Sequence, residues 1–133
     1  MAARLDRLKK RADFLRVAAL RRKWAAPGLI LQAAPAPGTE LQADSLRVGF
    51  TVSKKVGNSV CRNRARRRLK AAVSGVFPAH ASAGVDYVVI GRKETLERPY
   101  SLLLQDLLAA LKRVGALQKT HAAEAPDTAS PQN

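Results

Sequence analysis

Cysteine, histidine and acidic side chains are scarce in this sequence, and each shortage excludes a class of chemistry. The single cysteine, Cys61, cannot form an internal disulfide, and it cannot assemble a cysteine-based zinc site with the two distant histidines, His80 and His121. No run approaches the ~20 apolar residues of a membrane span, and the basic N-terminus lacks the apolar stretch of a secretory signal. We therefore expect a cytoplasmic protein that has no membrane partner and binds no metal or other cofactor itself.

The shortage of acidic residues leaves a large positive charge that is unevenly placed. Ten acidic residues stand against 24 lysines and arginines, for a net charge of +14. Such a field repels itself unless a polyanion is near, which favours a nucleic-acid partner. Eighteen of the 24 cations lie in the first seventy residues, and no acidic residue stands between Asp44 and Asp86.

The length of 133 residues fits one domain, whose core should be modest because aromatic residues make up only 5%. We expect a single RNA-binding domain over residues 1–117, in which residues 1–10 form a loose arm. Residues 118–133 are rich in Ala, Thr, Pro and Gln, which predicts a disordered tail. The free protein is expected to be a monomer.

Hydrophobic periodicity and turn residues predict a mixture of helices and strands. Helices are expected over residues 11–22, 58–77 and 99–114, the second capped by Asn58 or Ser59 and ended by Pro78. Strands are expected near Trp24 and over residues 29–31, 46–54 and 85–90. In the clearest strand, 46–54, alternate residues from Leu46 onward face the core.

The helix predicted over residues 58–77 has an apolar stripe opposite an arc of cations. At ~100° per residue, the stripe contains Ala65, Leu69, Ala72, Val73 and Val76, and the arc contains Asn63, Arg64, Arg66, Arg67 and Lys70. Arginine grips phosphate oxygens bidentately, and cations this dense destabilise an isolated helix unless a polyanion offsets their repulsion. The arc therefore predicts contact with the backbone of a folded RNA.

The same stretch resembles a known family. Residues 48–58 read VGFTVSKKVGN and residues 62–70 read RNRARRRLK, a pair of motifs similar to the signature of the bacterial ribonuclease P protein. The likeness extends upstream to residues 8–11 and to Asp13 with Phe14, and downstream to residues 86–93. It covers most of residues 5–114.

The resemblance implies an α+β fold of order αβββαβα, a two-layer sandwich with a mixed four-stranded sheet. It implies a left-handed βαβ crossover, where the general rule alone would predict a right-handed one. The implied function is that of a ribonuclease P subunit, which assists a catalytic RNA in endonucleolytic removal of the 5′ leader from precursor tRNA. In the resembled enzyme the protein binds the leader and the RNA subunit and broadens substrate specificity. The RNA binds the Mg²⁺ and performs the hydrolysis, so no protein side chain is implied as catalytic.

Site residues follow from the resemblance by position. The residues expected to face RNA are Lys54, Lys55, Arg62, Asn63, Arg64, Arg66, Arg67 and Lys70. Phe14 and Thr51 should line a cleft between the first helix and the sheet, where an aromatic ring can stack on a leader base for ~1–3 kcal/mol. Ala18 and Gln32 stand where relatives often place cleft aromatics. Trp24 is either a substitute for them or a half-buried hydrophobe.

Side chains for catalysis by the protein itself are not evident. Asp13, Asp44 and Asp86 each have an ordinary cap or turn explanation, and His80 is expected to be solvated. Two other classes stay open. A ribosomal-type structural RNA-binding protein would explain the charge equally well. A DNA-binding regulator could also use a basic helix, although this one lacks the mixture of Asn, Gln, Ser and Thr that reads base edges.

Overall fold

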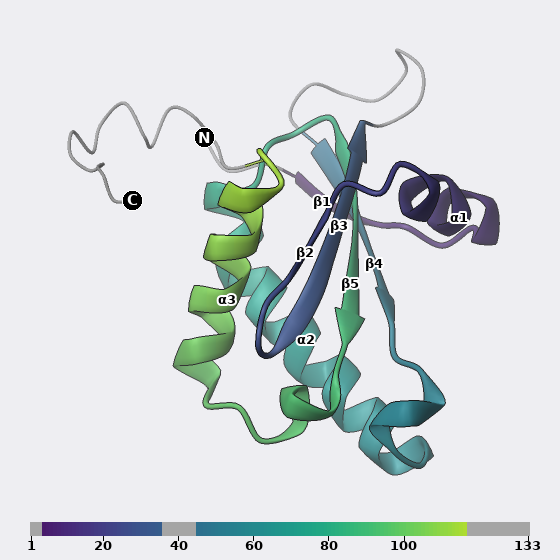
Figure 1. Ribbon diagram of the computed structural model, residues 1–133. Coiled ribbons are helices and arrows are strands. Elements are labelled where there is room, and N and C mark those ends of the chain that lie inside the picture. Colours follow the sequence, from purple (N-terminus) through teal and green to yellow (C-terminus); the bar gives the residue numbers. More distant parts are fainter. Residues whose placement is uncertain (1–3, 36–44, 117–133) are drawn as a thin grey trace.

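The computed structural model describes residues 4–35 and 45–116, which form a mixed sheet with helices on both faces (Figure 1). The elements follow the chain in this order: β1 (Arg4–Arg7), α1 (Arg11–Ala19), β2 (Lys23–Ala25), β3 (Leu29–Pro35), β4 (Ser45–Thr51), the 3₁₀ turn η1 (Lys54–Val56), α2 (Ser59–His80), β5 (Val85–Gly91), the 3₁₀ turn η2 (Lys93–Leu96) and α3 (Tyr100–Arg113). The predicted α+β class is confirmed, and the predicted order αβββαβα follows β1. The tail expected over residues 118–133 lies outside the described residues.

The sheet is mixed because α2 connects two parallel neighbours. β4 and β5 run parallel, with Phe50 opposite Val89, whereas β3 is antiparallel to both β5 and β2. β1 adds to the free side of β4 and runs parallel to it, which gives the strand order β1-β4-β5-β3-β2. The connection from β4 through α2 to β5 is the expected crossover, and its left-handed sense stays a prediction.

The main core lies between the sheet and the long helices α2 and α3. Leu46 and Val48 of β4 are buried in it, as their alternation predicts. The intervening side chains face α1, where a smaller cluster contains four buried residues: Leu8, Val17, Ala34 and Val88. The sheet and the α2–α3 pair are thus the two expected layers, and α1 lies on the opposite face (Figure 1).

The prediction of a loose arm over residues 1–10 is wrong for residues 4–7, which form β1. Leu5 lies opposite Leu46 in the parallel ladder, and its half-buried side chain packs against the main core. The edge of β4 offers backbone groups that need partners, and pairing with them orders a segment with little apolar content of its own. The sheet therefore has five strands rather than four.

Two helix ends also differ from the prediction. α2 continues past Pro78 to His80. The proline ring keeps a helical φ, although it removes one backbone hydrogen bond and crowds the carbonyl four residues back. The carbonyl that loses this bond belongs to Ser74, an exposed residue whose backbone can bond water instead. α1 ends at Ala19 rather than near residue 22, since Arg21 takes a left-handed φ of 62°.

Candidate RNA-binding surface

The residues expected to contact RNA begin in the turn before α2. The Ser53 hydroxyl accepts a hydrogen bond of 3.3 Å from the Lys55 amide, which starts η1 and leaves Lys54 and Lys55 exposed. Asn58 then caps α2, with its Oδ1 accepting a 2.9 Å hydrogen bond from the Cys61 amide. The two local caps place both lysines beside the first turn of the helix.

α2 buries the predicted apolar stripe and exposes the opposite arc. The stripe is buried along its whole length: Ala65, Leu69, Ala72, Val73 and Val76. On the arc, Asn63, Arg64 and Arg67 are exposed, while Arg66 and Lys70 are half-buried. Arg66 donates to the Asn63 side chain at 3.2 Å. Arg64 and Arg67 make no hydrogen bond or ion pair to any described residue, so both guanidinium groups are available to a ligand.

Two arginines at the flanks of the arc turn back to the protein. Arg62, one of the expected RNA contacts, donates to the Gly57 carbonyl at 2.9 Å. Arg68 donates to three carbonyls at 2.6, 2.9 and 2.5 Å, those of Thr95, Leu96 and Arg98. Among the cations of the arc, Arg64 and Arg67 are therefore the most available to a ligand. The guanidinium group of Arg68 is instead bound by the protein itself.

A groove, here called the β4 groove, lies where β1, β4 and α2 meet. It consists of two adjoining hollows of about 200 and 240 Å³ that share four lining residues: Arg7, Val48, Phe50 and Lys70. The larger hollow is also lined by Phe14 from α1 and Arg66 from α2. The ammonium of Lys70 lies 5.9 Å from the centroid of the Phe50 ring. The groove is thus lined by one expected leader residue, Phe14, and by two expected RNA contacts, Arg66 and Lys70.

Phe14 and Thr51, the two expected leader residues, share a face of the sheet but not a hollow. Phe14 lies against Gly49, where an added Cβ would come 2.3 Å from the ring carbon Cζ. Thr51 follows two residues later on the same face of β4, in a half-buried row with Ile90 and Ile30. Phe14 therefore lines the β4 groove, and Thr51 lies on the sheet beyond it.

Trp24 does not belong to this face of the sheet. It lies opposite Leu31, whose side chain is buried in the main core, and the Arg113 guanidinium carbon is 4.9 Å from its ring centroid. The tryptophan consequently faces the α3 side, away from Phe14. It is a partly exposed hydrophobe covered by an arginine, on the opposite face of the sheet from the expected cleft.

The expectation that Asp13 and Asp86 have only cap or turn roles is wrong. Asp86 is fully buried in β5 and accepts hydrogen bonds from Arg16 and, at 2.8 and 2.6 Å, from Arg47. Asp13 lies 3.4 Å from Arg16 and 3.8 Å from Arg47. The hydrogen bonds that Arg47 donates to Asp86 raise the pKa of Arg47 above its ordinary value. Sequence reasoning missed this cluster because Arg16 and Asp86 are 70 residues apart.

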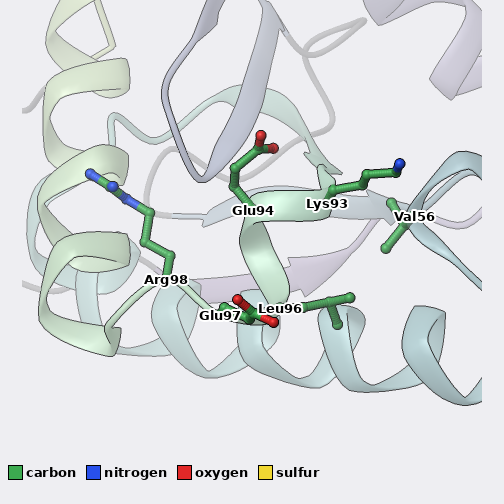
Figure 2. A pocket seen from close by; sticks show the side chains of 6 residues that line it. All are labelled: Val56, Lys93, Glu94, Leu96, Glu97 and Arg98. Atoms are coloured by element: carbon green, nitrogen blue, oxygen red, sulfur yellow. The ribbon is translucent and has the colours of Figure 1, made fainter.

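A third hollow, of about 540 Å³, adjoins η2 and has a lining of mixed charge (Figure 2). Lys93 and Arg98 bring cations, while Glu94 and Glu97 bring carboxylates. Figure 2 shows the two glutamates pointing to opposite sides of the η2 turn. Because both carboxylates would repel phosphate, we assign no RNA contact to this hollow.

Metal-ligating side chains do not cluster in residues 4–35 and 45–116, where no group of three His, Cys, Asp or Glu could hold an ion. In the same part of the chain, no helix is long and apolar enough to cross a membrane. His121 and Asp44 lie outside the described residues.

The fold and the charged helix face define a small basic α+β protein of the RNA-binding class. A family model described as ribonuclease P matches residues 2–115. The chain is 94% identical over 133 residues to the ribonuclease P protein component of Paramagnetospirillum magneticum, covering 100% of both chains. It is 50% identical over 115 residues to that of Gluconacetobacter diazotrophicus, covering 86% of this chain and 96% of the relative. A solved structure, the Staphylococcus aureus RNase P protein, is similar with a TM-score of 0.67 and 27% identity, over 84% of this chain and 97% of that one.

The chain belongs to the family of bacterial ribonuclease P protein components. It is a subunit of the ribonuclease P holoenzyme and aids 5′ maturation of tRNA together with the RNA subunit. This membership decides against the two alternatives that charge alone left open, a ribosomal-type protein and a DNA-binding regulator.

Proposed function

We propose that the exposed arc of α2 and the turn before it bind the phosphate backbone of the ribonuclease P RNA, while the β4 groove and the sheet beyond it hold the precursor tRNA leader. The residues assigned to RNA are Lys54, Lys55, Arg62, Asn63, Arg64, Arg66, Arg67 and Lys70. Those assigned to the leader are Phe14 and Thr51. The observation that carries the proposal is that Arg64 and Arg67 are exposed and unpaired within the described residues, on the helix that also lines a groove combining aromatic rings with cations.

The α2 arc suits a folded RNA because its cations are held on a rigid element. Arg64 and Arg67 stand three residues apart, so their guanidinium groups lie on neighbouring turns of one helix face. Each can form two parallel hydrogen bonds to a phosphate. Binding releases condensed counterions, so affinity for the RNA subunit should fall steeply as salt concentration rises.

The β4 groove suits a single strand because it offers an aromatic surface and cations side by side. A base can stack on Phe14 or Phe50. Lys70 and Arg66, the two cations of the arc that also line the groove, can attract the adjoining phosphates of the leader. Stacking and charge contacts tolerate any base, since every base has a flat face. A leader held in this way can vary in sequence, which would broaden the range of precursor tRNAs that the holoenzyme accepts.

The chemical step is assigned to the RNA subunit, which binds Mg²⁺ and hydrolyses the phosphodiester. The protein's part is affinity and positioning, exercised in the cytoplasm by a protein that is a monomer when free. Its cations neutralise phosphates that would otherwise require counterions, so the need for Mg²⁺ should fall when the protein is bound.

Reconstitution tests this proposal directly. Cleavage of a precursor tRNA by the RNA subunit is measured at low Mg²⁺ with no protein, with the unmodified chain and with the Arg64→Glu/Arg67→Glu variant. We expect the unmodified chain to restore cleavage and the double variant to fail at the same protein concentration. Lys112→Glu, which changes an exposed cation of α3, is the control and should restore cleavage. Equal restoration by all three proteins would overturn the proposal.

A further inference from the structure

α1 has little apolar contact to hold it on the sheet. Val17 is its one fully buried side chain in the described structure. The cluster beneath the helix has four buried residues, against 22 in the main core. Apolar stabilisation scales with the area removed from water, so this cluster constrains the rotation of α1 only weakly.

A buried carboxylate supplies the missing constraint. The Asp86 carboxylate accepts hydrogen bonds from Arg16 of α1 and from Arg47 of the neighbouring strand β4. Arg16 also donates to the carbonyl of Pro35, at the end of β3, at 3.1 Å. One arginine of α1 is therefore bound to two strands of the sheet at once.

The burial of Asp86 favours the orientation of α1 in which Arg16 reaches the carboxylate. Its side chain is 0% exposed, while those of Arg16 and Arg47 are 34% and 26% exposed. A carboxylate removed from water is strongly disfavoured unless charged donors satisfy it. Rotations of α1 that withdraw Arg16 are consequently disfavoured. Both arginines lie on the same side of the sheet as Phe14, but their guanidinium groups are already paired with Asp86.

We propose that Asp86 is a positioning residue for leader binding, which acts through Arg16 to fix α1 and thereby holds the Phe14 ring in the β4 groove. Phe14 precedes Arg16 by two residues on one short helix, so a rotation that frees the arginine also moves the ring. The fit is tight, because an added Cβ at Gly49 would lie 2.3 Å from that ring. This inference rests on the proposed function, since it takes the groove as the leader site.

The test compares two substrates in the reconstituted holoenzyme. Affinity is measured for a precursor tRNA with a short single-stranded leader and for the same tRNA without one, and the ratio isolates the leader contribution. The variants are Asp86→Asn, Arg16→Met, Phe14→Ala and the Asp86→Asn/Phe14→Ala double variant. Arg11→Met is the matched control, because it removes the same charge from an exposed position of α1. Thermal unfolding of each variant shows whether it folds, and Arg16→Met serves where Asp86→Asn does not.

We expect Phe14→Ala, Asp86→Asn and Arg16→Met each to lower the ratio, on the order of tenfold, the size of one base stacked on an aromatic ring. The double variant should be no worse than Phe14→Ala, and Arg11→Met should keep the ratio. A preserved ratio in folded Asp86→Asn or Arg16→Met, or an equal loss in Arg11→Met, would overturn this inference alone. A leader contribution that is absent from the unmodified holoenzyme, or that survives in Phe14→Ala, would overturn the proposed leader site as well.

Discussion

Arg68 should stabilise the fold without contributing to RNA affinity, although it stands in the middle of the arginine run. Its guanidinium group donates to the carbonyls of Thr95, Leu96 and Arg98, which end η2 and lead into α3. A hydrogen bond to a charged group contributes about 1.5–3 kcal/mol. Arg68 is half-buried and therefore partly screened by solvent, so we discount the three hydrogen bonds together to about 2–3 kcal/mol.

The perturbation is Arg68→Met, which keeps the apolar stem and removes the donors. At roughly 4 °C per kcal/mol for a domain of this size, the melting temperature should fall by about 8–12 °C. Affinity for the RNA subunit, measured well below the melting temperature, should fall by about threefold or less, since only a distant screened charge is lost. Arg67→Met should do the reverse, with an unchanged melting temperature and roughly tenfold weaker binding, about 1.4 kcal/mol. The same pattern in both variants would refute the division of roles.

Three further changes test other parts of the structure. Gly49→Ala should displace Phe14, which would destabilise the fold by roughly 1–3 kcal/mol and lower leader affinity while binding of leaderless tRNA stays constant. Asn58→Ala removes the α2 cap and should lower the free energy of unfolding by about 1 kcal/mol, as measured in urea. Burial raises the pKa of Tyr87, whose hydroxyl donates to the Ser82 carbonyl at 2.8 Å. The folded state therefore keeps this proton more tightly, so stability should be level below the ordinary tyrosine pKa of about 10 and fall as pH rises above it. Tyr87→Phe should remove that alkaline fall, and an identical fall in the variant would assign it to another group.

The sequence predicted those parts of the fold whose cause is local. Alternation from Leu46 to Phe50 predicted the core face of β4, and helical spacing from Ala65 to Val76 predicted the buried stripe of α2. Asn58 was one of the two predicted caps, because capping depends on a few neighbouring residues.

The parts that sequence reasoning missed depend on contacts between distant segments. β1 forms because the free edge of β4 happens to lie beside residues 4–7, which periodicity cannot show. The same holds for the pairing of Arg16 with Asp86, and for the carbonyls that Arg68 contacts at η2. Helical spacing leaves Arg68 outside the arc, but it cannot show which groups the guanidinium contacts.

The salt dependence of binding to the RNA subunit tests the central claim most directly. The association constant is measured over a range of salt concentrations for the unmodified chain, for Arg64→Met/Arg67→Met and for the control Lys112→Met. If the exposed arc of α2 binds phosphates, the double variant should show a slope of log affinity against log salt that is shallower by roughly two, about one for each lost contact, and the control should keep the original slope. An unchanged slope in the double variant would contradict the account.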